Sequence, residues 1–200
     1  MIWIGTSGYN YPEWKGSFYP DTLPAAKMLP YYAERFPTVE INYTFYRMPN
    51  EKLVSGWAAQ TPEPYRITLK APRRITHDSR LKNCGELVQG FCRVAASLGP
   101  KLGALLFQLP PNMKKDLGVF DAFLADLPPR LCAAFEFGHP SWFDEEVFER
   151  LRAVMDSYGA SGRVRMAVAE IRVQGLDKAV KGFNVIATAN NRDKGVNDLS

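Results

Sequence analysis

The chain has 200 residues, of which 46% are hydrophobic and 23% are charged, as is typical of a soluble globular domain with a sizeable core. No stretch approaches the ~20 apolar residues of a membrane span. The formal net charge of +4, from 25 basic and 21 acidic side chains, permits an anionic ligand but does not by itself indicate one. A dedicated nucleic-acid binder usually shows a basic cluster; the nearest here is KAPRR at residues 70–74, for which a solvated loop is the simpler interpretation.

Short apolar runs alternate with longer, helix-like segments along the chain. The runs that we expect to be strands lie at residues 2–5, 38–46, 65–71, 102–111 and 131–140. A strongly amphipathic helix is expected at residues 141–159, with Ser141 or Asp144 near its start and Gly159 just past its end. Strands that alternate with helices predict right-handed βαβ units and a parallel sheet.

Such a parallel sheet is either open and doubly wound or closed into a barrel. The first expected strand ends in GTSGYNYP rather than in the Gly-x-Gly-x-x-Gly of a dinucleotide-binding fold, and the sequence has no P-loop. Each expected strand is apolar at its start and polar at its end, which is typical of (β/α) barrels with active sites at the carboxyl ends of the strands. We therefore predict an α/β fold that resembles a TIM barrel.

The polar residues at the expected strand ends are the candidates for a functional site. They are, in chain order, Glu40, Asn42, Thr44, Tyr46, Thr68, Lys70, Gln108 and Glu136. Because side chains alternate between two faces along a strand, the first four are expected to share one face of the second strand. His77 and His139 follow the third and fifth strands. An exposed sheet face is the alternative to a barrel mouth, and the flanking helices make it the weaker one.

Each candidate also has a purely structural interpretation. Glu136 and Lys70 could form a buried ion pair, and Gln108 could hold loop backbone in place. His77 could cap the helix that follows it, and His139 could orient its turn. The aromatic residues that could pack the rim instead of stacking on a ligand are Trp3, Tyr9, Tyr11, Trp14, Tyr46 and Trp142. The convergence of so many polar residues on strand ends favours a functional site.

Five longer motifs carry a resemblance to a known family. They are IGTSGYNYPEWKGSFYP, FPTVEINYTFYRMP, LKAPRRITHDSRL, LGALLFQLPP and AFEFGHPSWFDEEVF. In this order they resemble the YecE-like proteins, or domain of unknown function 72, over about residues 1–155. The resemblance implies a bacterial, cytoplasmic protein with a TIM-barrel-like fold, and it implies no particular reaction. The recurrent polar positions of the family fall on Glu40, Asn42, Lys70, His77, Gln108, Glu136 and His139.

The sequence departs from this family pattern in two places. Members typically have Glu-Phe-Arg-His-Pro-Ser-Trp at the fifth strand, whereas this chain has Gly138 in place of the arginine, so an expected anion-binding group is missing. The pattern also fades after about residue 156. The remaining ~45 residues are fewer than the roughly 90 that three more βα units need in a barrel of ~250 residues.

We therefore expect one barrel-like domain over residues 1–200 with fewer than eight βα units. It would consist of a family-like core, residues 1–155, and an atypical segment, residues 156–200, in which residues 164–173 and 183–189 are candidate strands. An open or shortened barrel, a frameshifted or internally deleted gene product, and closure by another chain are the alternatives. An open sheet would leave an unpaired edge strand, through which the chain could form oligomers.

The cysteines and the N-terminus indicate where the protein functions. Cys84, Cys92 and Cys132 lack metal-ligand spacing and are expected to be reduced thiols in a cytoplasmic protein. The N-terminal stretch MIWIGTSGYNYPEW lacks the basic and apolar regions of a signal peptide. We assign no metal ligands, because no pair of candidates has close spacing such as His-x-x-x-His, and the sequence does not identify a cofactor.

Acid–base chemistry on a small polar, sugar or phosphate-bearing substrate is the function that these residues support best. The enzyme would be a hydrolase of phosphodiester or glycosidic bonds, or an isomerase. The expected catalytic residues are Glu40, Lys70, His77, Glu136 and His139. The expected substrate-binding residues are Tyr9, Asn42, Tyr46, Gln108 and Trp142.

Two other functions fit the same residues. A module that binds nucleic acid or sugar without catalysis would use the rim aromatics and KAPRR, and its affinity would fall steeply with salt. An inactive, shortened member of the family is the second alternative, to which Gly138 and the short tail both point. Such a protein would give a broad melting transition and would aggregate.

Overall fold

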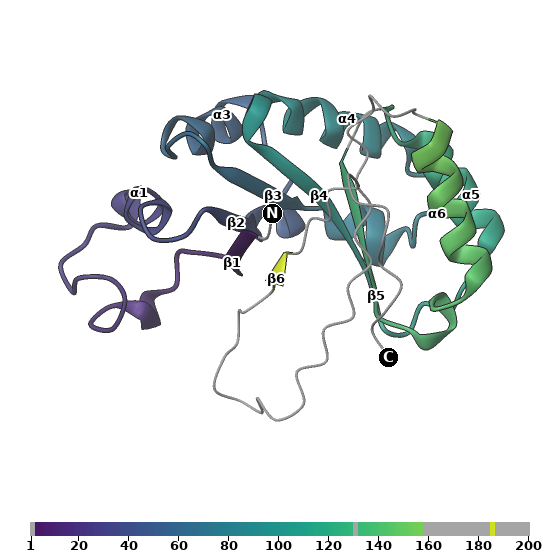
Figure 1. Cartoon of the computed structure of the whole chain (residues 1–200), viewed down its shortest axis with the longest axis horizontal. Coiled ribbons are helices and arrows are strands. Elements are labelled where there is room, and N and C mark those ends of the chain that lie inside the picture. Colours follow the sequence, from purple (N-terminus) through teal and green to yellow (C-terminus); the bar gives the residue numbers. More distant parts are fainter. Residues whose placement is uncertain (1–2, 130–131, 158–184, 187–200) are drawn as a thin grey trace.

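The structure, a computed structural model, describes residues 3–129, 132–157 and 185–186. Its sheet has five parallel strands in chain order, namely β1 (Trp3–Ser7), β2 (Thr38–Ile41), β3 (Arg66–Lys70), β4 (Leu102–Leu109) and β5 (Ala133–Phe137). A short antiparallel strand, β6 (Val185–Ile186), pairs with β1. The sheet curls into part of a barrel (Figure 1). The predicted α/β, TIM-barrel-like fold with fewer than eight βα units is confirmed for the described part of the chain.

Helices follow the strands, and all but the short α2 pack on the outside of the sheet (Figure 1). They are α1 (Met28–Ala33), α2 (Tyr43–Tyr46), α3 (Glu51–Ala59), α4 (Gly85–Ala95), α5 (Leu117–Asp126) and α6 (Glu145–Ser157). Short 3-10 turns lie at Pro12–Trp14, Ala25–Lys27, Ala96–Lys101 and Pro140–Trp142, and a π-helical turn lies at Arg74–Asp78. Side-chain caps mark the starts of α3 and α5, where Asn50 and Asp116 accept hydrogen bonds from backbone N–H groups three residues later.

The strands bury one face against the helices and present the other to the inside of the barrel. Val39, Ile67, Leu69, Phe107 and Phe135 are almost fully buried and belong to one core with residues of α3, α4, α5 and α6. Each such side chain contributes about 1.5–3 kcal/mol through removal from water. The alternation of side chains then places the polar residues of the same strands on the inner face.

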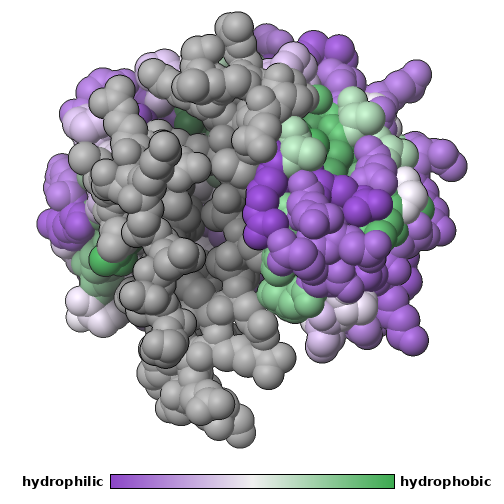
Figure 2. Space-filling model, turned by 45° about the vertical axis from the view of Figure 1, so that its right-hand side comes forward, coloured by the Kyte–Doolittle hydropathy of each residue, from purple (hydrophilic) through white to green (hydrophobic). Residues whose placement is uncertain are grey.

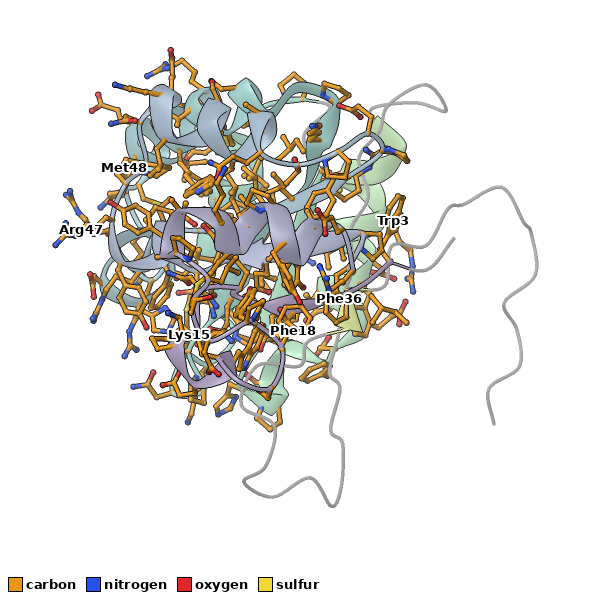
Figure 3. The ribbon with its side chains drawn as sticks, turned by 90° about the vertical axis from the view of Figure 1, so that its left-hand side faces the viewer. Trp3, Lys15, Phe18, Phe36, Arg47 and Met48 are labelled. Atoms are coloured by element: carbon orange, nitrogen blue, oxygen red, sulfur yellow. The ribbon has the colours of Figure 1, made fainter. Side chains whose placement is uncertain are left out.

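The outer surface has the character expected of helices that cover a sheet. Figure 2 shows that hydrophilic residues occupy most of the described surface on this side, with smaller hydrophobic patches between them. On another side of the molecule, Phe18 and Phe36 lie close together beside α1, with ring centroids 5.9 Å apart (Figure 3). Within the described ranges, no helix is both long and apolar enough to cross a membrane.

The second strand is shorter than the sequence predicted. It ends at Ile41, and the chain turns into α2 at Asn42, whose φ of −84° and ψ of −17° are helical. The expectation that Thr44 and Tyr46 share a strand face with Glu40 is therefore wrong. Alternating aromatic and β-branched residues suggested a strand, but the turn is held by the Thr44 hydroxyl, which donates toward the carbonyl oxygens of residues 41 and 70 at 3.0 and 2.6 Å.

The C-terminal predictions are covered only in part by the structure. The amphipathic helix expected at residues 141–159 is present as α6, and the Asp144 carboxylate accepts a 2.9 Å hydrogen bond from the N–H of Glu146 in its first turn. The candidate strand at residues 164–173 and most of the segment 156–200 lie outside the described residues. Of the candidate strand at residues 183–189, Val185–Ile186 form β6.

Candidate active site

Polar side chains gather where the carboxyl ends of the parallel strands meet at one edge of the sheet. In the strand register, Ser7 lies beside Glu40, and Gln108 lies beside Glu136. Lys70 of β3 lies beside Leu106 of β4, two residues before Gln108. The polar positions therefore advance along the edge from β1 to β5, as the stagger of tilted barrel strands requires.

A cavity of about 690 Å³ opens at this edge, a size that suits a small-molecule ligand. Its polar lining comes from Ser7, Asn10, Asn42, Lys70 and Gln108, and its aromatic lining from Tyr9, Tyr11, Tyr43, Phe45, Tyr46 and Trp57. No carboxylate lines this cavity among the residues that the structure describes. The one charged side chain in this described lining is the cationic Lys70.

A chain of hydrogen bonds fixes the β1–β2 side of the cavity. The Ser7 hydroxyl donates to the Glu40 carboxylate at 2.6 Å, and the Asn42 amide nitrogen donates to the Ser7 oxygen at 2.8 Å. Glu40 is only 1% exposed, so it supports the wall from behind. Because Asn42 must donate through its nitrogen, its Oδ1 is left as an acceptor, and this buried atom has no hydrogen-bond partner in the described structure.

The β3 side of the cavity combines a cation, an aromatic ring and a histidine. The Lys70 ammonium lies 5.2 Å from the centre of the Phe45 ring, and the imidazole of His77 packs against that ring edge to face, with centroids 5.0 Å apart. The Nδ1 atom of His77 is 2.9 Å from the hydroxyl of Thr76. Burial, with the positive charges of Arg73 and Lys70, lowers the pKa of His77 below its ordinary value.

The β4–β5 side carries the second glutamate. The Gln108 amide donates to a Glu136 oxygen at 2.8 Å across two neighbouring strands. Among the described residues, the hydrogen-bond partner of Glu136 is thus Gln108. The ion pair of Glu136 with Lys70, which the sequence allowed as an alternative, is not formed between these two described residues. Glu136 is half-buried, whereas Gln108 lines the cavity.

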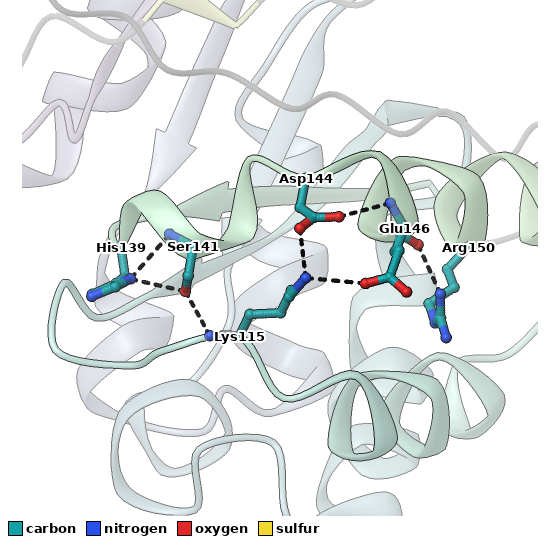
Figure 4. Close-up of polar contacts among 6 residues, drawn as sticks. All are labelled: Lys115, His139, Ser141, Asp144, Glu146 and Arg150. Carbon is teal, nitrogen blue, oxygen red and sulfur yellow. Dashed lines mark hydrogen bonds and ion pairs between the residues drawn. The ribbon is translucent and has the colours of Figure 1, made fainter.

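His139 lies in the turn after β5 and is not one of the described residues that line the cavity. Its Nδ1 accepts from the N–H of Ser141 at 3.1 Å, and the Ser141 oxygen accepts from the N–H of Lys115 at 2.8 Å (Figure 4). The Lys115 ammonium contacts Asp144 at 2.6 Å and Glu146 at 3.1 Å, and this contact lowers the pKa of Asp144. These bonds fasten the turn to the loop that follows β4.

Trp142 lies in the hydrophobic core and not at the cavity. It has no exposed surface, it stacks on Phe137 with centroids 5.1 Å apart, and its indole N–H donates to the Met113 carbonyl at 2.7 Å. By contrast, Tyr9 and Tyr46 both line the cavity, and burial raises the pKa of the Tyr9 hydroxyl.

The structure therefore brings most of the predicted site residues together. Tyr9, Asn42, Tyr46, Lys70 and Gln108 line one cavity, Glu40 and Glu136 are hydrogen-bonded to the lining residues Ser7 and Gln108, and His77 adjoins it through Phe45. Sequence reasoning missed Ser7, Tyr43, Phe45 and Trp57 as lining residues. Ser7 could have been found had the first strand been extended from residue 5 to residue 7, since alternation then places it on the inner face.

Gly138 occupies a position of close backbone approach. A Cβ atom there would lie 2.8 Å from both the Leu109 carbonyl oxygen and the Pro111 nitrogen. The corner after β5 thus leaves no room for a side chain, which gives a packing reason for the glycine at this position. No cluster of three His, Cys, Asp or Glu side chains that could hold a metal occurs in the described ranges.

In the described part of the chain, these features define an α/β protein with part of a TIM-like barrel and a polar cavity at the carboxyl edge of its strands. Residues 3–180 match the model of the family described as Protein of unknown function DUF72, and the chain belongs to this family. It is 31% identical to UPF0759 protein YecE of Escherichia coli K12 over 144 residues, which cover 72% of this chain and 50% of YecE. It is 29% identical to UPF0759 protein YunF of Bacillus subtilis 168 over 171 residues, which cover 80% of this chain and 58% of YunF.

Solved structures of the family have the same fold. A DUF72 family protein from Thermotoga maritima MSB8 superposes with a TM-score of 0.69 at 28% identity, covering 83% of this chain and 64% of that one. One from Enterococcus faecalis V583 has a TM-score of 0.57 at 20% identity, covering 72% and 58% of the two chains. The chain spans about half the length of the curated relatives that it matches.

Proposed function

We propose that the cavity at the carboxyl edge is the active site of an enzyme that transfers protons on a small polar substrate with an anionic group, such as a phosphate. One observation carries this proposal: Lys70 is the single charged residue in the described lining, and the hydrogen-bonded pair of Gln108 and Glu136 stands on the neighbouring strands. A cation inside a partly enclosed cavity attracts an anion more strongly than one in open water does.

Lys70 is the proposed binding group for the anion. Its ammonium is a compact charge with three hydrogen-bond donors, and the Phe45 ring supports it from one side. Burial lowers the pKa of the nearby His77 and so favours its neutral form, and a neutral imidazole can accept a proton. An anion at Lys70 would offset the positive charge that acts on His77 and would raise its pKa.

Glu136 is the proposed proton-transfer group. It is half-buried, and the Gln108 amide holds one of its oxygens at 2.8 Å, so its orientation is fixed before a substrate arrives. Glu40 has a different proposed role, because it is buried behind Ser7 and sets the orientation of Asn42 through that hydroxyl. The unpartnered Oδ1 of Asn42 would then accept a hydrogen bond from a substrate hydroxyl or amine.

Turnover of a defined set of sugar phosphates and phosphodiesters tests this proposal. Incubation in D₂O followed by mass spectrometry detects an isomerase through deuterium incorporation, and incubation in H₂¹⁸O detects a hydrolase. We expect the wild type to convert at least one compound and Glu136→Gln to be slower by about 10²–10⁴-fold, the usual contribution of a general acid or base. Glu13→Gln, a change in an exposed turn, is the matched control.

Two outcomes would contradict the proposal. One is that the wild type leaves every compound and its isotopic content unchanged. The other is that Glu136→Gln converts a compound as fast as the control variant. In the first case binding without catalysis becomes the better account, for which the strongly exposed rings of Tyr43 and Tyr46, at 46% and 73%, provide stacking surfaces. In the second case Glu136 is not the proton-transfer group.

A further inference from the structure

A second hollow lies directly beside the cavity. Its volume is about 630 Å³, and its lining includes Asn50, Lys52 and Gln60 from the region of α3. The two hollows share four lining residues, namely Tyr9, Tyr43, Leu53 and Trp57. They are therefore separated only by a wall of side chains, and a ligand that extends past this wall would contact both.

The shared wall presents an aromatic edge to each hollow. Tyr43 stands on α2 and is 46% exposed, while Trp57 on α3 is 5% exposed. Their rings meet edge to face with centroids 6.3 Å apart, so the buried Trp57 supports the exposed Tyr43. Rings presented in this way pack against flat or cyclic parts of ligands.

The charges on the two sides of the wall have the same sign. Lys70 lines the first cavity and Lys52 lines the second hollow, and neither lining contains a carboxylate among the described residues. A ligand that spans the wall would thus meet one cation on each side of an aromatic ring. The complementary molecule carries an anion at each end and a ring between them.

We infer that the two hollows form one extended site for a ligand with two phosphate-like groups held apart by a ring. The part of this inference that concerns Lys70 rests on the proposed function, whereas the part that concerns Lys52 is new. A sugar bisphosphate and a nucleoside bisphosphate share this chemistry. The two differ in whether the central ring is a sugar alone or also carries a base.

Matched pairs of ligands test the second anionic subsite by isothermal titration calorimetry. Fructose 1,6-bisphosphate is compared with fructose 6-phosphate, and thymidine 3′,5′-bisphosphate with thymidine 5′-monophosphate. We expect the bisphosphate of at least one pair to bind about tenfold or more tightly than its monophosphate, and the pair that shows the gain identifies the central ring. Lys52→Gln should bring that bisphosphate down to the affinity of its monophosphate, whereas Lys82→Gln, an exposed lysine outside both hollows, should keep the gain.

The outcomes separate this inference from the proposed function. Equal affinities within both pairs, or a gain that survives in Lys52→Gln, would overturn the extended site. If monophosphates bind the wild type and lose affinity in Lys70→Met while the bisphosphates gain nothing, the inference fails and the anion site at Lys70 stands. If no phosphate compound binds the wild type, both fail.

Discussion

Replacing Gly138 with alanine tests whether the corner after β5 is built around a glycine. The added Cβ would lie 2.8 Å from the Leu109 oxygen and 2.8 Å from the Pro111 nitrogen. Both neighbours are backbone atoms, one at the end of β4 and one in the loop after it, and they cannot swing aside as the end of a flexible side chain can. Gly138→Ala should therefore destabilise the fold by overpacking.

The expected magnitude follows from the cost of overpacking, which is typically about 1–3 kcal/mol. Each kcal/mol lowers Tm by about 2–4 °C in a domain of this size, so we expect a fall of about 2–12 °C. Gly90→Ala is the matched control, because it lies in α4 and an added Cβ there meets no atom within 4 Å. Alanine stabilises such a helix position by about 0.5–1 kcal/mol, which raises Tm slightly.

Thermal unfolding followed by circular dichroism measures both variants under the same conditions. A Gly138→Ala protein that melts at or above the temperature of the wild type, while Gly90→Ala behaves as expected, would show that the corner has room for a Cβ atom. Gly138→Arg, which introduces the residue typical of the family, should be at least as unstable as Gly138→Ala, because its Cβ makes the same two close contacts. A stable Gly138→Arg protein would show that the corner can open.

Three further predictions concern other buried groups. Lys101→Met should lower the free energy of unfolding in urea by about 1–3 kcal/mol, because the buried ammonium donates to two carbonyls at the end of α3 at 2.8 and 2.5 Å; a loss equal to that of the exposed Lys27→Met would contradict this. Iodoacetamide at pH 8 should modify Cys84 and Cys92 slowly in the folded protein, since burial raises the pKa values of their thiols to about 11 and about 12. Mass spectrometry that finds either cysteine modified as fast in the folded protein as in urea would contradict this prediction. The proton NMR signal of His77 should titrate with a pKa below 6.5. Because the folded protein favours the neutral imidazole, the contribution of His77 to the stability of the fold is lost as the pH falls through that pKa. Lys70→Met removes one of the positive charges that lower this pKa and should therefore raise it. A midpoint above 6.5 would exclude the burial that the structure gives this imidazole.

The fold was predictable from the sequence where hydrophobic pattern and chain order agree. The alternation of apolar runs with helical segments correctly predicted five parallel strands in chain order, and the Gln108–Glu136 register follows from both residues closing neighbouring strands. The pattern failed after Ile41, because residues 43–46 are β-formers by composition but a hydrogen bond from Thr44 to the end of β3 holds them in a helical turn. Such a tertiary contact leaves no local signal.

The site was predictable at the level of residues but not of their arrangement. The sequence could not reveal that Glu40 is buried and bonded to Ser7, or that the Gln108 amide donates to Glu136. Nor could the sequence show that Trp142 lies in the core while Tyr43 lies between the two hollows. Trp142 and Tyr43 belong to aromatic-rich stretches of similar composition. These differences depend on which face each short turn presents, and that is decided by packing between distant segments.

The most direct test of the central claim, that the carboxyl edge of the sheet binds an anionic group at Lys70, is to locate an anion by anomalous diffraction from crystals soaked in tungstate. We expect an anomalous peak within hydrogen-bonding reach of the Lys70 ammonium, inside the cavity that Asn42 and Gln108 also line. A map with peaks at surface lysines or arginines and none beside Lys70 would contradict it.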